Sequence, residues 1–229
     1  MFNKKAKSGS MKKGETIVEV LVALVVLTIG AATATSLIVT ALRSNQFDKD
    51  SLVALNLAQE GLEYMHNLRD TNWLKFSANT QGCWNTKPNS TSCDTSGVTT
   101  VLQPSDGTHE YALGLNAAGQ TDLAYIASKL DVSDGVTATT EDKYELNYYN
   151  NGDYVGSSAP VAMTLSTQSK FYRSIDVAYF TIAGASPWTV SPTANPLLAD
   201  MMQVSSTVEW MDSSAMHQVK LTSALTRYK

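Results

Sequence analysis

The pattern of apolar and polar positions divides the chain into three stretches. From Val20 to Leu42, 23 consecutive residues carry no charge, which is about 35 Å of helix and enough to cross a bilayer core. From residue 44 to 72, apolar residues recur every three or four positions, as in a helix with one buried face. Beyond residue 144, apolar and polar residues alternate, as in strands with one buried face.

The second stretch continues the first as an amphipathic helix, with no proline between them. Small and apolar residues form its seam, at Ala54, Ala58, Gly61, Met65 and Leu68, flanked by Leu57 and Leu62. Polar residues fall mainly on the other side, at Asn56, Gln59, Glu60, Glu63, Asn67 and Asp70. We expect one helix from about Thr16 to about Asn72, with Glu60, Glu63 and Arg69 on a solvated face.

The third stretch predicts antiparallel strands. The segment YELNYYNNGDYVG sets Asn151 and Gly152 between aromatic and β-branched residues, which is typical of a tight hairpin. Further on, alternation puts apolar residues on shared faces, at Phe171, Ile175, Val177 and Tyr179, then Val204, Val208 and Trp210, then Val219 and Leu221. The seam of the helix would cover such a sheet, so we expect an α+β body.

The segments between these elements give weaker signals. Residues 77–110 are rich in small polar residues and predict irregular structure, in which Trp84 covers a small core. Residues 121–131 suggest a short helix. A connecting loop is predicted where three prolines fall between the last strands, at Pro187, Pro192 and Pro196.

Charge is distributed unevenly along the 229 residues. The first 14 residues carry five lysines and no acid, which leaves −9 for the rest of a chain whose net charge is −4. A basic head before an apolar run favours an anionic membrane surface and retention on the cytoplasmic side. The acidic remainder argues against nucleic acid as a partner, since phosphate contacts need clustered lysine and arginine.

Three interpretations of the N-terminal segment follow. The first is a secretory signal peptide that is cut near Ala32-Thr33-Ala34, and the second is an uncleaved membrane anchor with the lysines inside. The third is a segment in which Glu19, at the start of the apolar run, has a functional role. The apolar pattern continues past the possible cut, which disfavours the first. An anchor leaves Glu19 unexplained, because a carboxylate in a bilayer costs on the order of 3 kcal/mol without a partner.

The stretch KKGETIVEVLVAL resembles the prepilin leader of type IV pilins and of the pseudopilins of type II secretion. The resemblance implies that a prepilin peptidase cuts after Gly14 and methylates the new amino terminus at Glu15. It also matches Thr16 to the family's threonine and Glu19 to the glutamate that pairs with the terminal amine of a neighbouring subunit during assembly. The chain departs from the family in having Glu15 where phenylalanine is usual, and no proline before Pro88.

Two further segments resemble minor pilins and pseudopilins, namely LAQEGLEYMHNLRDTNW and the terminal hairpin signal around Trp210 and Val219. The resemblance implies a leader (1–14), a transmembrane and assembly helix (15–43), its amphipathic continuation (44–76) and a β-rich extracytoplasmic body (77–229). It implies a structural filament subunit, most like a minor pilin, with other pilin subunits and membrane lipid as further partners. The alternatives are a membrane-anchored binding module and a secreted enzyme.

Little in the sequence suggests catalysis or a cofactor. The histidines His66, His109 and His217 are far apart, and no common catalytic or nucleotide-binding motif is present. Outside the cytoplasm Cys83 and Cys93 can form one disulfide; otherwise they are unrelated thiols. The acidic segment with Asp131 and Asp134 is either a calcium-binding loop or an ordinary acidic loop.

Overall fold

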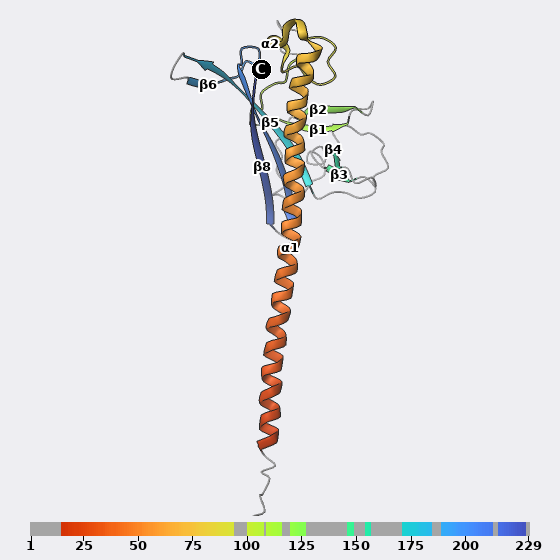
Figure 1. The fold of residues 1–229 in the computed structure, drawn as a ribbon, viewed down its shortest axis with the longest axis vertical. Coiled ribbons are helices and arrows are strands. Elements are labelled where there is room, and N and C mark those ends of the chain that lie inside the picture. The colour runs from red at the N-terminus through yellow and green to blue at the C-terminus, as the bar shows by residue number, and fades with distance from the viewer. Residues whose placement is uncertain are drawn as a thin grey trace, which may run out of the picture. The chain divides into compact units, whose positions relative to one another are not determined.

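The computed structural model describes residues 15–93, 100–107, 109–115, 120–126, 146–148, 154–156, 171–184, 189–212 and 215–227. The chain divides into two compact units, Met1–Asp50 and Ser51–Lys229, and each is considered by itself. Helix α1 (Glu15–Lys75) supplies the described residues of the first unit and continues into the second (Figure 1). The predicted long helix is therefore confirmed, and it ends three residues later than expected.

Two short helical segments and eight strands follow α1 in the described chain. The helical segments are η1 (Ser77–Asn79) and α2 (Thr80–Cys83). The strands are β1 (Glu110–Leu115), β2 (Thr121–Ile126), β3 (Leu146–Tyr148), β4 (Tyr154–Gly156), β5 (Phe171–Ala183), β6 (Thr189–Thr193), β7 (Met201–Asp212) and β8 (Ala215–Thr226).

The main sheet has the strand order β2–β1–β5–β7–β8, and β6 pairs with β5. Each of these pairings is antiparallel. The longest ladder joins β7 to β8, from Met201 opposite Thr226 to Asp212 opposite Ala215. β7 is buried on both faces from Val204 to Trp210, whereas β8 mostly alternates between exposed and partly buried residues.

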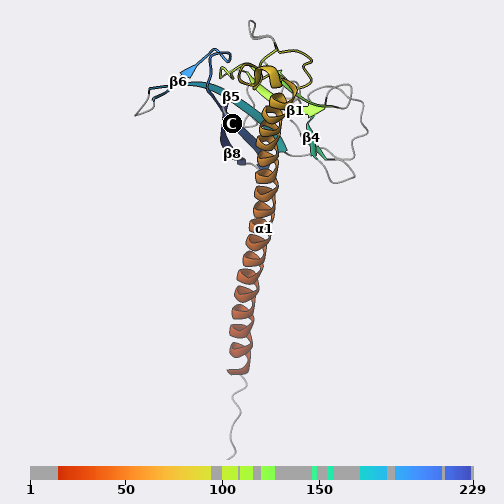
Figure 2. The same cartoon turned by 45° about the horizontal axis from the view of Figure 1, so that its top comes forward.

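The second half of α1 covers one face of this sheet, and both ribbon views show it beside β5 and β8 (Figures 1 and 2). Ala54, Ala58 and Met65 on the predicted seam are completely buried. Ala54 and Ala58 pack with residues of β5, β7 and the helix itself, namely Leu57, Phe171, Val208 and Trp210. The α+β architecture is thus confirmed, with the predicted seam as the contact between helix and sheet.

A second cluster around Met65 forms the larger core of the body. Its buried aromatic residues are Trp84, Tyr111 and Tyr179, and the Trp84 and Tyr179 rings meet edge to face at 6.4 Å. Trp84 is only 2% exposed, so it belongs to the main core rather than covering a small one. Burying aromatic rings contributes more apolar area than any other residue type.

Two predictions about secondary structure are wrong. Residues 121–126 are strand β2 rather than helix, because all six pair with β1; residues 127–131 lie outside the described chain. Pro192 is not in a loop but in β6, opposite Phe180 of β5. Proline is tolerated there because β6 pairs with β5 alone and does not need every backbone N–H for a ladder.

The predicted hairpin around residue 151 is present as a small separate sheet. β3 and β4 pair antiparallel, with Tyr148 opposite Tyr154. Asn151 and Gly152, predicted to form its turn, lie outside the described residues, as does Pro187.

Candidate assembly site

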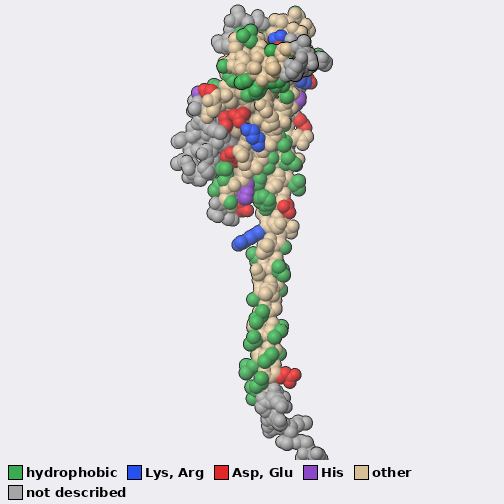
Figure 3. All heavy atoms as spheres, turned by 90° about the vertical axis from the view of Figure 1, so that its left-hand side faces the viewer, with side chains coloured by type: hydrophobic (Ala, Val, Ile, Leu, Met, Phe, Trp, Pro, Cys, Tyr) green, Lys and Arg blue, Asp and Glu red, His purple; other side chains and the backbone are tan. Residues whose placement is uncertain are grey.

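The first half of α1 exposes apolar side chains on all sides. Every residue from 17 to 42 is exposed, and its large aliphatic side chains range from 43% exposure at Val39 to 71% at Leu37. Figure 3 shows these hydrophobic side chains along the helix. By length and composition the helix can cross a membrane. Such a surface suits lipid or the apolar faces of other helices better than water.

The four threonines within this apolar run satisfy their hydroxyl groups inside the helix. The hydroxyl of Thr28 donates to the carbonyl oxygen of Val25 at 2.9 Å, and that of Thr35 donates to the carbonyl of Ala31 at 2.7 Å. Thr33 and Thr40 make the same kind of bond one turn back. Each threonine therefore offers no unpaired hydroxyl proton to a hydrocarbon environment, where an unsatisfied donor is costly.

Glu19 is the exception in this run. Its side chain is exposed among Val18, Val20 and Leu21. Among the residues that the structure describes, none forms an ion pair or hydrogen bond with it. A carboxylate that moves into lipid or into an apolar bundle needs a cationic partner, because the attraction is strong there and an unpaired charge is costly.

The residues of the predicted cleavage point surround the start of the helix. α1 begins at Glu15, the residue after Gly14, and Thr16 continues it. Gly14 lies outside the described chain, and of Glu15 and Thr16 the structure describes the backbone alone. Glu19 follows Glu15 by four residues, so the two positions lie on the same face about one turn apart.

Comparison with known proteins bears on this segment. A family model described as the prokaryotic N-terminal methylation motif matches residues 9–35. The chain carries a prepilin leader of the type IV pilin and pseudopilin type. The prepilin match spans Gly14, Glu19 and the first part of the exposed apolar helix, which are the features that suggested the resemblance. No curated protein and no solved structure matches the chain.

Near the end of α1, a disulfide and two hydrogen bonds stabilise the segment that follows the helix. Cys83 and Cys93 form a disulfide, so in the structure they are not separate thiols. Asn72 on α1 is buried, and its side-chain amide donates to the carbonyl oxygens of Trp84 at 3.2 Å and Thr86 at 2.8 Å. These contacts attach the segment after α2 to the helix and leave no reactive cysteine in the described chain.

The histidines make separate structural contacts. His66 on α1 hydrogen-bonds to the hydroxyl of Ser223 on β8 at 2.9 Å. His109 lies 2.8 Å from the Asp106 carboxylate and stacks on Tyr125, and the His217 ring contacts that of Trp210. Among the described residues, no group of three His, Cys, Asp or Glu could hold a metal ion. Asp131 and Asp134, the calcium candidates, lie outside those residues.

The prediction of a solvated face is wrong for Arg69, whose side chain is only 17% exposed, whereas Glu60 is exposed as predicted but also has a buried partner. Glu60 is half-exposed but accepts a 2.8 Å hydrogen bond from Nη1 of Arg173, whose side chain is 2% exposed. The same Nη1 donates to the carbonyl oxygen of Leu57 at 3.0 Å. Arg69 pairs with Asp70 and covers the Trp73 ring at 4.5 Å. Glu63 is exposed as predicted.

Arg173 is a buried charged residue that sequence reasoning missed. Burial lowers its pKa, and the Glu60 carboxylate opposes that shift. Its position in the alternation, between Phe171 and Ile175, places it on the helix-facing side of β5. This alternation could have indicated that Arg173 is buried. It could not have identified Glu60 as the partner, because Glu60 is 113 residues away in the sequence.

At Gly61, helix α1 approaches the sheet closely. A methyl group added at Gly61 would collide with the hydroxyl of Ser206 on β7 and lie 3.4 Å from Cδ of Arg173. The seam therefore needs a glycine here because β7 leaves no room for a side chain. Gly30, in the apolar half of the helix, has no neighbouring atom within 4 Å.

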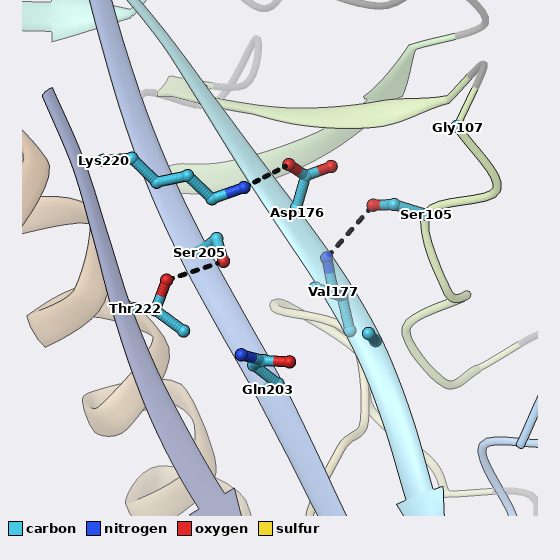
Figure 4. Close-up of a pocket in the computed structure, with 9 residues that line it drawn as sticks. Ser105, Gly107, Asp176, Val177, Gln203, Ser205, Lys220 and Thr222 are labelled. Atoms are coloured by element: carbon cyan, nitrogen blue, oxygen red, sulfur yellow. Dashed lines mark hydrogen bonds and ion pairs between the residues drawn. The ribbon is translucent and has the colours of Figure 1, made fainter. Parts of the chain in front are cut away.

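The face of the sheet away from α1 contains a polar hollow of about 320 Å³ (Figure 4). Lys220 lies 4.0 Å from Asp176, and the hydroxyls of Ser205 and Thr222 are 3.0 Å apart. Ser105 closes one side, where its hydroxyl accepts a hydrogen bond from the backbone N–H of Val177. With one acid and one base, this hollow has no net charge with which to select an ion.

Proposed function

We propose that the chain is a structural subunit, most like a minor pilin, of a type IV pilus-like or pseudopilus filament. The observation that carries this proposal is the methylation motif at residues 9–35, joined directly to a helix whose apolar surface has no cover within the described chain. The subunit is not an enzyme in this proposal. Its working parts are a basic leader (1–14), an assembly helix (15–43), its amphipathic continuation (44–76) and a β-rich body (77–229).

The subunit begins in the cytoplasmic membrane as a single-pass protein, with its lysine-rich leader inside and its body outside. A prepilin peptidase removes the leader after Gly14 and methylates Glu15. The apolar helix then leaves the lipid by packing against the helices of other subunits at the cell surface. This transfer keeps the backbone hydrogen bonds internal throughout, because a helix satisfies its own N–H and C=O groups in both environments.

Glu19 gives the bundle its axial register in this proposal. The amino terminus created at Glu15 of one subunit carries a positive charge, which pairs with Glu19 of its neighbour. The two charges attract strongly where water is excluded. A helix shifted by one turn would leave both charges unpaired, so the pair selects one alignment.

The mass of the chain isolated from its native membrane tests the processing. A mature subunit that starts at Glu15 has 215 of the 229 residues, with one added methyl group. A mass that starts at Met1 would indicate an uncleaved anchor, and one that starts at Thr35 a conventional signal peptide. Either result would reject the processing proposed here.

Substitution of Glu19 tests assembly separately from processing. We expect Glu19→Ala and Glu19→Gln to be cleaved normally, since the peptidase acts on the leader, yet to enter filaments at least tenfold less than the unchanged chain, because the neighbour's terminal amine is left unpaired in the bundle, at a cost of about 3 kcal/mol. Immunoblots of sheared filaments and of membranes measure both steps. Glu63→Ala, on the exposed face of the body's helix, is the matched control. Normal incorporation of Glu19→Gln would contradict the pairing.

A further inference from the structure

The polar hollow on the sheet face away from α1 has a floor of short side chains (Figure 4). In the register of the sheet, Asp176 on β5 lies opposite Ser205 on β7, and Ser205 lies opposite Thr222 on β8. Ala178, two residues further along β5, lies on the same face. Because these side chains are short, they leave a hollow of about 320 Å³ above them. This volume falls within the range of small-molecule sites, about 300–1,000 Å³.

Lys220 and Asp176 face each other across this hollow without a hydrogen bond. Their nearest nitrogen and oxygen atoms are 4.0 Å apart, which allows ionic attraction but is too long for a hydrogen bond. In the part of the chain that the structure describes, neither side chain makes a hydrogen bond to any other group. The ammonium group therefore keeps all its protons to donate, and the carboxylate keeps all its acceptor sites. A single oxygen atom fits between them, at about 2.8 Å from each.

Other unused hydrogen-bonding groups line the same hollow. The Ser105 hydroxyl accepts from the backbone N–H of Val177, so its own proton remains to donate. The side-chain amide of Gln203 makes no hydrogen bond among the described residues, so it can both donate and accept. The hydroxyls of Ser205 and Thr222 share one bond of 3.0 Å, which leaves one hydroxyl proton unused. The hollow thus offers donors and acceptors side by side.

This mixture favours a neutral ligand that carries hydroxyl groups. A hydroxyl donates and accepts at the same oxygen, so one hydroxyl can accept from Lys220 while it donates to Asp176. An anion would be repelled by the Asp176 carboxylate, and a cation by the Lys220 ammonium group. A peptide group has its donor and its acceptor on different atoms, so one atom of it cannot serve both charges. Several adjacent hydroxyls on one ring, as in a sugar, match the closely spaced groups of the hollow.

We propose that this hollow binds a neutral sugar residue, with one hydroxyl between Lys220 and Asp176, an adjacent hydroxyl on Gln203, and the ring over Ala178. The sugar is either free or the end of a neutral polysaccharide. The described residues that line the hollow include no aromatic ring, so the binding of one sugar unit depends on hydrogen bonds and is weak. The proposal concerns the body alone and goes beyond the filament role, which stands or falls independently of it.

The test is titration of the full chain in dodecylphosphocholine micelles, which avoid the sugar headgroups of glycoside detergents. The ligands are glucose, galactose and mannose, with cyclohexanol as a ring of the same size that has a single hydroxyl, each up to about 100 mM. We expect at least one hexose to bind and to shift the side-chain amide resonance of Gln203, and cyclohexanol to do neither. The amide of Asn72, which is held in the core, should not shift. Absence of binding by all three hexoses, or an equal effect of cyclohexanol, would overturn the proposal.

Disaccharides separate the two sources of the sugar. Each hexose is compared with a disaccharide that carries it at the non-reducing end, namely maltose, lactose and mannobiose. Tighter binding of the disaccharide supports the proposal with the end of a polysaccharide as the ligand. Equal or weaker binding supports it with the free sugar as the ligand.

Variants locate the site. Asp176→Asn and Lys220→Met each remove one partner of the bridging hydroxyl, and we expect each to weaken hexose binding about tenfold, as loss of a charge-assisted hydrogen bond does. Glu63→Gln and Lys49→Met are matched controls at exposed positions of α1 outside the hollow, and should leave binding within about twofold. Ala178→Leu keeps every polar group but fills the floor, so it should abolish binding.

The variants can also contradict the proposal. Unchanged binding in Asp176→Asn, in Lys220→Met or in Ala178→Leu, or an equal loss in the two controls, would each overturn it. Near-ultraviolet circular dichroism checks that each variant remains folded. If Ala178→Leu does not fold, the two charge variants decide the outcome, because their side chains are partly exposed and nearly keep their size.

Discussion

The two halves of helix α1 treat apolar side chains in opposite ways. From residue 17 to 42 they point outward on all sides, whereas the seam that includes Ala54, Ala58 and Met65 is buried against the sheet. The backbone is the same helix throughout. The difference therefore lies in what covers it: within the described chain the first half has no cover, and the second half has a sheet. Helix formation alone does not distinguish an assembly surface from a core.

The largest expected effect on stability comes from substituting Gly61, in the covered half of the helix. Gly30, in the uncovered half, is its control. Gly61→Val should destabilise the body by about 3 kcal/mol, because β7 leaves no space beside Gly61 and overpacked cores cost that much. Gly30→Val should leave the stability of the body unchanged, since no atom lies within 4 Å of the added carbon. Denaturant unfolding of the full chain in micelles, followed by near-ultraviolet circular dichroism, measures both.

The opposite pattern would be informative. If Gly30→Val destabilised the body as much as Gly61→Val, the two halves of the helix would not be energetically distinct. If Gly30→Val reduced entry into filaments while the body stayed stable, the first half of the helix would be shown to pack against other subunits and the second half against its own sheet.

A smaller effect is expected at the buried arginine. Glu60→Ala removes the partner of Arg173 and should cost about 2 kcal/mol, less than a fully buried pair because Glu60 is half-exposed. Arg173→Met removes the buried charge and keeps most of the side-chain volume, so it should change stability by less than about 1 kcal/mol. The same unfolding measurement compares the two. A larger loss for Arg173→Met than for Glu60→Ala would show that the arginine contributes stability beyond its pairing.

The smallest expected effect on stability comes from the ionisation of buried tyrosines. It is absent at neutral pH and is confined to the body. Burial raises the pKa of Tyr111 and Tyr179. Each tyrosine has a higher pKa in the folded chain than in the unfolded chain, where it is about 10. Its contribution to the free energy of unfolding is therefore fully present below about pH 10. The contribution falls as the pH rises above about 10, because the unfolded chain loses the proton more readily. Residues 15–50 contain no tyrosine.

Circular dichroism between pH 9 and 12 should therefore lose the near-ultraviolet signal of the body before the helical signal of the first half. Tyr179→Phe should make the loss less steep. A simultaneous loss of both signals would count against a difference in pH sensitivity between the two units.

Much of the architecture could be predicted because it follows periodicity. The seam at Ala54 and Met65 and the alternation in β5, β7 and β8 each repeat a local rule along the chain. The leader was predictable for another reason, since Gly14 and Glu19 stand at fixed spacing in a short segment that the methylation motif covers.

The features that were missed depend on distant partners. Residues 121–126 contain alanine and leucine, which favour helix, and they form a strand because β1 pairs with all six. Pro192 predicts a loop, yet it lies in β6, because this strand pairs with β5 on one side only. The pairing of Glu60 was missed because Arg173, its partner, is 113 residues further along the chain. In each case tertiary contact outweighed local preference.

The central place of β5 in the sheet has a consequence for the order in which the body can fold. β1, β6 and β7 all pair with β5, and the helix meets this strand through Leu57 and Arg173, which are 116 residues apart. During synthesis the seam residues Ala54 and Ala58 are made long before β5 and β7, the strands that cover them. A chain truncated before β5 would therefore leave this apolar seam exposed to water, where it favours aggregation.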